Sequence, residues 1–149
     1  IFRTSRNYKE NEVFNDRGLI MIGIGTDIID IRRIEKTINR FGDKFKKRIF
    51  TDKEIKKCEE RKLSINCYAK RYAAKEAASK ALGTGFRKGV YWKDLEVVNL
   101  SSGKPTMKFY GNSKKYLESM VKNEKEPLIN LSITDEYPYA HAILIIESN

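Results

Sequence analysis

The chain has 149 residues, of which 40% are hydrophobic and 34% charged, a balance typical of one globular domain with its own core. No run approaches the roughly 20 consecutive apolar residues that span a bilayer, so we expect no membrane-spanning helix. The net charge of +10 predicts an anionic partner, such as nucleic acid, a phosphorylated cofactor or an acidic protein.

The first twenty residues are mixed and polar, and they contain no apolar stretch of the kind found in secretory signals. Basic and acidic side chains are interleaved there, which fits a transit peptide poorly. Met21 stands directly before the first apolar stretch. We therefore expect residues 1–20 to be a poorly ordered tail or an added segment, and residues 21–149 to form the folded domain.

The predicted elements are those of an α+β fold, a small, mostly antiparallel sheet packed with helices. Asp30 is expected to cap a first helix with an apolar stripe, and residues 51–54 form a capping box that begins another helix. A long alanine-rich helix ends at Gly83. In chain order we expect a strand at 21–29, a helix from 31 to about 41, a basic turn at 44–48, a helix from 51, a helix at 66–82, strands at 94–100 and 106–110, a short helix capped by Asn112, and a closing pair of strands at 128–134 and 140–147.

Two acidic side chains stand out against apolar or small neighbours. Asp27 ends the first strand, and Glu76 lies among alanines on the long helix, four residues before Lys80. A turn aspartate and an exposed helical ion pair would also explain them. Together, however, two carboxylates and a lysine can hold Mg²⁺ against a phosphate, because Mg²⁺ is usually bound by one or two carboxylates plus substrate oxygens.

Basic side chains form two further groups. Arg71, Lys75 and Lys80 on the long helix are candidates for cradling phosphates. The first helix has a basic face that suits docking of an acidic helix, and it consists of Arg32, Arg33, Lys36 and Arg40.

The remaining candidate residues are expected to be structural. Cys58 and Cys67 have neither zinc-site nor redox-motif spacing, so we expect reduced thiols in a cytosolic protein. His141 lies in a strand beside alanines, and Tyr68 and Tyr72 have the helical spacing of core residues.

Four segments resemble the bacterial holo-acyl-carrier-protein synthases, which are small 4′-phosphopantetheinyl transferases. The resemblance extends from Met21 to the C-terminus, with the motifs in the family's order. They are residues 23–34, residues 71–85 with the sequence Lys-Glu-Ala-Ala-Ser-Lys-Ala at their centre, residues 103–105, and residues 131–136 followed by Tyr139 and Ala140.

This resemblance implies the family's fold, usually assembled as a cytoplasmic homotrimer with active sites between subunits. It implies Mg²⁺-dependent transfer of the 4′-phosphopantetheine arm of coenzyme A to a serine of acyl carrier protein, for fatty acid biosynthesis, and neither a nucleic acid nor a membrane as partner. By the family pattern, Asp27 and Glu76 would bind the metal, and Glu76 and Lys80 would be catalytic. The expected coenzyme A contacts are Arg71, Lys80, Lys62, Gly83 and Gly85, and the expected carrier contacts are Arg33, Arg32 and Arg40.

One position departs from the family pattern, because Asn130 stands where many members have a histidine. Asparagine does not titrate near neutral pH. The general base therefore stays open between Glu76, a metal-bound hydroxide and another acid such as Asp52. Two other classes fit the basic surface, a small RNA-binding protein and a non-enzymatic partner of an acidic helical protein, and the latter needs neither Asp27 nor Glu76.

Overall fold

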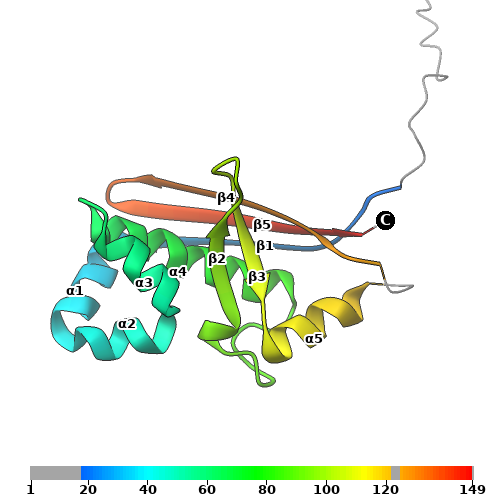
Figure 1. Cartoon of the computed structure of the whole chain (residues 1–149), viewed down its shortest axis with the longest axis horizontal. Helices are drawn as coiled ribbons and strands as arrows, with labels where there is room; N and C mark the ends of the chain where they lie inside the picture. The colour runs from blue at the N-terminus through cyan, green and yellow to red at the C-terminus, as the bar shows by residue number, and fades with distance from the viewer. Residues whose placement is uncertain (1–17, 122–124, 149) are drawn as a thin grey trace, which may run out of the picture.

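In a computed structural model, which describes residues 18–121 and 125–148, the chain has the predicted α+β architecture (Figure 1). The expectation for residues 1–20 falls mostly outside the described residues, and Ile20 already belongs to the first strand. None of the described helices is both long and apolar enough to cross a membrane. The elements are β1 (Ile20–Asp30), α1 (Ile31–Phe41), α2 (Asp43–Ile49), α3 (Asp52–Glu59), α4 (Ser64–Ala81), a 3₁₀ turn η1 (Trp92–Asp94), β2 (Leu95–Asn99), β3 (Pro105–Phe109), α5 (Gly111–Met120), β4 (Leu128–Glu136) and β5 (Tyr139–Ser148).

Helix α4 packs on a three-stranded antiparallel sheet with the strand order β1-β5-β4. Two glycines let the β1 backbone approach the helix closely. A Cβ atom at Gly23 would collide with the carbonyl oxygen of Ala81, and one at Gly25 with that of Ala77. Since side chains alternate along a strand, Asp27 lies on the same side of β1 as these glycines, toward α4.

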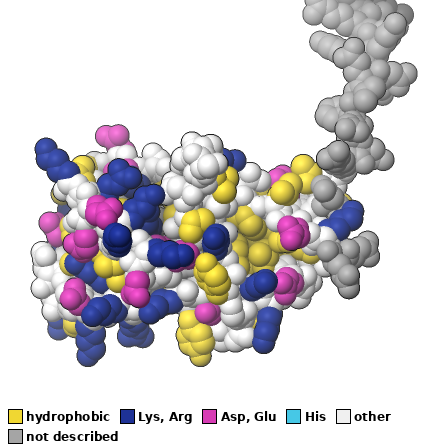
Figure 2. Space-filling model, in the orientation of Figure 1, with side chains coloured by type: hydrophobic (Ala, Val, Ile, Leu, Met, Phe, Trp, Pro, Cys, Tyr) yellow, Lys and Arg dark blue, Asp and Glu magenta, His cyan; other side chains and the backbone are white. Residues whose placement is uncertain are grey.

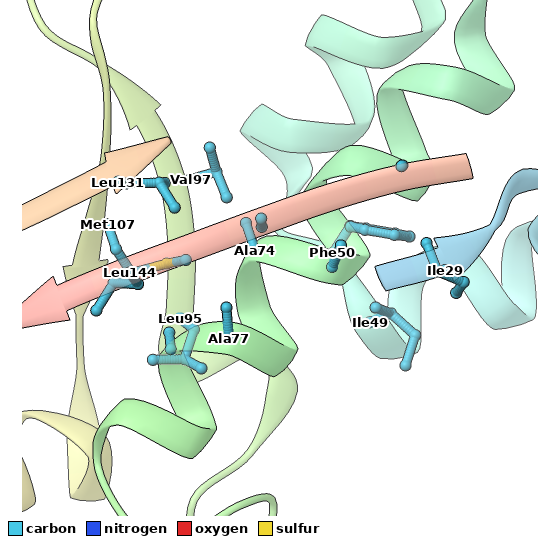
Figure 3. Packing of buried hydrophobic residues seen from close by; sticks show 14 of the residues in the cluster. Ile29, Ile49, Phe50, Ala74, Ala77, Leu95, Val97, Met107, Leu131 and Leu144 are labelled. Atoms are coloured by element: carbon cyan, nitrogen blue, oxygen red, sulfur yellow. The ribbon is translucent and has the colours of Figure 1, made fainter. Parts of the chain in front are cut away.

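Strands β2 and β3 form a separate two-stranded antiparallel sheet, so the predicted strands divide between two small sheets. This hairpin packs against β4 and α4. The core lies between the hairpin, α4 and the larger sheet, and Figure 3 shows its side chains. Its members include Ala74 and Ala77 from α4, Leu95, Val97 and Met107 from the hairpin, Leu131 from β4 and Leu144 from β5.

The predicted caps of the first and third helices are confirmed. The Asp30 carboxylate accepts a hydrogen bond from the Arg32 backbone at 2.9 Å, and Thr51 and Glu54 form the reciprocal capping box of α3. The predicted basic turn at 44–48 is wrong, because this segment forms helix α2. Its apolar residues Phe45 and Ile49 are four positions apart, so both can pack on the core from one side of a helix.

The predicted cap of α5 is also wrong. Tyr110 is the N-cap residue, and its backbone N–H donates to the Ser113 hydroxyl at 3.2 Å. Asn112 instead lies inside the first turn, where its side chain donates to the carbonyl oxygen of Gly89 at 3.1 Å. A long-range contact therefore replaces the local one that the sequence suggested.

The expectation of two reduced cysteines is wrong as well, since a disulfide joins Cys58 of α3 to Cys67 of α4. The short turn between these helices brings the two Cα atoms to 5.4 Å, which lies within the range that a disulfide spans. Both residues are buried. The bond therefore ties the start of α4 to α3.

Candidate active site

Strand β1 and helix α4 bring Asp27 and Lys80 into direct contact. The Lys80 Nζ donates to Asp27 Oδ1 at 2.9 Å and to the backbone carbonyl of Thr26 at 2.9 Å. The close approach at Gly23 and Gly25 lays β1 along the last turns of α4, which is why residues 53 positions apart meet. Lys80 therefore pairs with the strand carboxylate, although its spacing from Glu76 also allowed a helical pair.

Glu76 belongs to the same cluster. Its half-buried position raises its pKa above the ordinary value, the negative charge of Asp27 raises it further, and the positive charge of Lys80 acts in the opposite direction. These influences mean that Asp27, Glu76 and Lys80 lie within electrostatic reach of one another. The metal and catalytic residues predicted from the sequence thus gather at one place.

The donor set of this cluster fits a hard cation. Two carboxylates with no sulfur or imidazole ligand suit Mg²⁺, which keeps several waters and takes its other ligands from substrate oxygens. Within the described part of the chain, no group of three or more His, Cys, Asp or Glu side chains is arranged to hold a metal ion. A site built from this chain would therefore depend on Asp27 and Glu76 and would be completed by a ligand.

An aromatic wall borders the carboxylates, and the sequence did not reveal it. Tyr72 lies one helical turn before Glu76 and packs on Trp92 with ring centroids 4.7 Å apart, and Trp92 stacks on Phe86 at 3.7 Å. Burial raises the Tyr72 pKa, as do the charges of Glu76 and Asp27, while Arg33 lowers it. Tyr72 thus packs against the edge of the core, one turn before Glu76, and Tyr68 is fully buried as predicted.

Lys75 cannot cradle a phosphate, contrary to the sequence-based expectation. It has no exposed surface, and its Nζ forms an ion pair with Glu54 Oε2 at 2.7 Å. Burial lowers its pKa, and the charge of Glu54 opposes that effect. The two residues of the Lys75-Glu76 pair thus point to different sides of α4.

Arg71 and Lys62 line a different place, a cavity of about 490 Å³. Positions 71 and 76 are roughly 140° apart around the helix, and neither Asp27 nor Glu76 lines this cavity. Arg71 is buried, its Nη1 donates to Cys67 Sγ at 2.9 Å, and its Nε has no partner among the described residues. The other cations lining this basic pocket are Lys57, Arg61 and Lys70.

Gly83 and Gly85 follow the end of α4, just beyond Lys80. Both have positive φ angles, +74° and +57°, and the N–H of Gly85 donates to the Ser79 carbonyl at 3.0 Å. Nothing lies within 4 Å of a Cβ atom built on either residue. Their backbone conformation, rather than a tight contact, therefore favours glycine.

The predicted docking residues lie exposed on α1, and each has a different environment. Arg32 forms an ion pair with Asp30, whose pKa this contact lowers to about 2, and Arg40 lies over the Phe41 ring at 5.0 Å. Arg33 forms no ion pair with any residue that the structure describes, and its charge reaches Tyr72. Of these three arginines, Arg33 is the one whose charge acts on Tyr72.

Among the described residues, no hydrogen bond joins Asn130, His141 or Asp52 to the side chains of Asp27, Glu76 or Lys80. Asn130 donates to Glu147 at 2.7 Å, and His141 Nε2 is 2.8 Å from the Thr26 hydroxyl. Asp52 is exposed in the first turn of α3. It is not among the charges that shift the Glu76 pKa.

Comparisons with known proteins point to a single family. A family model described as the 4′-phosphopantetheinyl transferase superfamily matches residues 23–142. The holo-[acyl-carrier-protein] synthase of Parvibaculum lavamentivorans is 55% identical over 127 residues, which are 85% of this chain and 96% of that protein.

Two solved structures are also similar to this chain. The holo-[acyl-carrier-protein] synthase of Neisseria meningitidis has 35% identity and a TM-score of 0.75, and the match covers 87% of this chain and 100% of the other. The enzyme of Bacillus anthracis, solved in complex with CoA (3′,5′-ADP), has 37% identity and a TM-score of 0.69, with 87% and 98% covered.

Proposed function

Because this chain belongs to the 4′-phosphopantetheinyl transferase superfamily, as a holo-[acyl-carrier-protein] synthase, we propose that it modifies an apo-acyl carrier protein with coenzyme A. A serine hydroxyl of the carrier attacks the phosphorus that bears pantetheine. The new serine–phosphate bond forms as the pyrophosphate bond breaks, the serine proton leaves, and adenosine 3′,5′-bisphosphate is released. The meeting of Asp27, Glu76 and Lys80 is the observation that carries this proposal.

Asp27 and Glu76 would hold the Mg²⁺ on which we propose the reaction depends. A bound divalent cation supplies positive charge at the pyrophosphate and polarises the reacting phosphorus. Phosphoryl transfer needs such positioning and charge stabilisation more than covalent chemistry by the protein. Glu76, with its raised pKa, is our candidate acceptor of the serine proton.

Lys80 neutralises charge on the leaving phosphate in this proposal. Its side chain is half exposed, so its ammonium can turn from Asp27 to a phosphate oxygen without leaving the site. Gly83 and Gly85 follow Lys80 closely in the chain. Because they have no side chain, we propose that the backbone at these two residues can contact the coenzyme A phosphates directly.

The basic pocket around Arg71 and Lys62 is the second phosphate-binding element that we propose for coenzyme A. A buried guanidinium with an unpartnered Nε suits an anionic oxygen. Since this pocket and the carboxylates lie on different sides of α4, we infer that one coenzyme A molecule is bound by two neighbouring subunits.

The exposed face of the larger sheet supports assembly. Ile24 and Ile28 of β1 are 52% and 63% exposed, and Ile143 and Ile145 lie beside them on β5. An uncovered apolar sheet face of this kind marks an interaction surface. We propose that it joins three copies into a homotrimer, the usual assembly of the family.

The carrier protein is proposed to dock on α1 through Arg33, with Arg32 and Arg40 beside it. Dark blue side chains gather over α1 to α3 on the left of Figure 2, and such a basic surface would accelerate encounter with an acidic carrier. We place the reaction in the cytoplasm and in fatty acid biosynthesis.

A direct transfer assay tests the function. The protein is mixed with coenzyme A, Mg²⁺ and an apo-acyl carrier protein, and the carrier is weighed by mass spectrometry. The mass of one phosphopantetheine group per carrier is expected, lost when the acceptor serine is replaced by alanine or when EDTA removes the metal. An unmodified carrier under all conditions would reject the proposal.

A further inference from the structure

Lys75 directly precedes Glu76 but points into the protein interior. Its ammonium has three donors, and three oxygens surround it: Glu54 Oε2 at 2.7 Å, the Ile49 carbonyl at 2.7 Å and the Trp92 carbonyl at 3.1 Å. Each donor therefore has a partner, as a fully buried ammonium requires.

Glu54 extends this contact to the rest of the domain. Its Oε1 accepts from the Val97 backbone at 2.9 Å, and its Oε2 accepts from the Thr51 backbone at 2.9 Å. The Lys75–Glu54 pair thus connects the middle of α4 to the end of α2, the start of α3 and strand β2. Rotation of α4 about its axis would break several of these bonds together.

The same lysine also holds the aromatic wall of the site. It fixes the backbone of Trp92, and the Trp92 ring packs on Tyr72, one turn before Glu76. The Phe86 ring stacks on the same Trp92 ring. Two routes therefore lead from Lys75 to the carboxylate site, one along the helix backbone to Glu76 and one through Trp92 to Tyr72.

We propose that the buried Lys75–Glu54 pair positions Glu76 and Tyr72 for the transfer reaction, without touching substrate. This proposal rests on the proposed function. A buried ion pair contributes little stability over apolar residues of similar volume, so stability alone does not account for it. A pair that fixes one rotation of α4 accounts for the convergence of three segments, the end of α2, α3 and η1, on one ammonium of α4.

The test replaces both charges together, because removing one alone would leave the other buried and unpaired. The double variant Glu54→Gln/Lys75→Met is expected to fold and to keep its KM for coenzyme A within about threefold. Its kcat is expected to fall about 10- to 100-fold, the usual effect of misplacing a reacting group by about 1 Å.

A second measurement reports on position without using activity. Trp92 is the only tryptophan in the chain, so its fluorescence reports on the aromatic wall alone. In the double variant we expect a red-shifted Trp92 emission and faster quenching by iodide. The reason is that the Trp92 carbonyl no longer accepts a hydrogen bond from Lys75. Calorimetry should also show a smaller effect of Mg²⁺ on coenzyme A binding.

Lys46→Met/Glu59→Gln is the matched control. This pair is also 2.7 Å apart and joins α2 to α3, but it has no contact with Trp92 among the described bonds. Its kcat and its Trp92 emission should match those of the unaltered protein. Glu54→Asp keeps the negative charge but shortens the side chain by one methylene, so it covers the case in which the double variant does not fold, and it should show the same two changes at smaller size.

The outcomes separate the two proposals. Absence of transfer by the unaltered protein would reject the proposed function. Normal kcat in the folded double variant, or Trp92 emission identical to that of the unaltered protein in both Glu54 variants, would reject the positioning role. Equal losses in the control pair would also reject it, because the effect would then be a general one of removing ion pairs.

Discussion

The Lys80 ammonium lies 2.9 Å from the Asp27 carboxylate, although the two residues are 53 positions apart in the chain. The contact joins strand β1 to the last turn of helix α4. It places a positive charge on one of the two proposed metal ligands. When a phosphate and Mg²⁺ bind, the phosphate would pair with Lys80 and the metal would pair with Asp27. The Lys80–Asp27 ion pair would then be replaced by these two new ion pairs.

Replacing Asp27 by Asn should remove the metal-dependent activity while leaving the fold intact. We expect kcat/KM to fall about 10³-fold, in keeping with the several kcal/mol that a catalytic metal contributes. Steady-state kinetics across a Mg²⁺ titration measures this loss. Carrier binding should be unchanged, and retention of full activity by Asp27→Asn and Glu76→Gln would exclude the metal site.

Glu76→Gln should stabilise the metal-free protein near neutral pH and abolish transfer. The raised pKa of Glu76 means that folding disfavours its charged form, so its contribution to stability is present below its unfolded pKa and is lost as the pH rises through the folded value. Glutamine at position 76 cannot ionise, so the variant does not lose this stability as the pH rises. Melting temperatures at several pH values measure this, and a gain that is equal at pH 3 and pH 8 would contradict the explanation.

The proposed activity of the unaltered enzyme should decline on the acidic side at a higher pH than an ordinary glutamate would give. Protonation of Glu76 removes a metal ligand, and its pKa is raised by burial and by Asp27. The pH profile of kcat/KM measures the midpoint. Higher Mg²⁺ should move that midpoint to lower pH, and a midpoint that does not respond to Mg²⁺ would assign the titration to another group.

Lys62→Glu should raise the KM for coenzyme A about tenfold or more, because a charge-assisted contact in the basic pocket becomes a repulsion. If two subunits share each site, mixing this variant with Glu76→Gln should restore part of the activity that each lacks, since some interfaces would then combine an intact pocket with intact carboxylates. Co-expression and copurification of tagged subunits tests this. Complete inactivity of the mixed oligomer would favour sites built within one subunit.

Arg33→Glu should weaken carrier binding and reduce its dependence on salt, with the KM for coenzyme A unchanged. Surface plasmon resonance with apo-acyl carrier protein at two salt concentrations measures both effects. Lys115→Glu, an exposed charge reversal on α5, serves as the control. Equal losses in the two variants would indicate a general effect of net charge rather than docking on α1.

Reduction of the Cys58–Cys67 disulfide should lower the free energy of unfolding by about 2–3 kcal/mol, the value expected for a loop of this length. Thermal melts with and without a phosphine reductant measure the change. The variant Cys58→Ser/Cys67→Ser should not respond to the reductant. Two titratable thiols in the protein unfolded without reductant would show that the bond is absent.

Local signals in the sequence predicted much of the fold, since caps and helix ends depend on neighbouring residues. Asp30, the box of Thr51 and Glu54, and Gly83 all lie where they were expected. The failures have a common cause. The helix at 43–49, the long-range bond of Asn112 and the disulfide each depend on what packs beside the segment, which one stretch of sequence does not contain.

The sequence by itself determined which residues we propose for the chemistry: two carboxylates amid small or apolar neighbours, a lysine one turn away, and a basic first helix. Only the tertiary structure decided how they are arranged, because side-chain direction depends on helix rotation and strand register. It turned Lys75 into the core and Lys80 onto Asp27, and it placed Arg71 on another side of α4 from Glu76. Sequence patterns describe neighbouring residues, whereas the candidate site forms where segments distant in the sequence pack together.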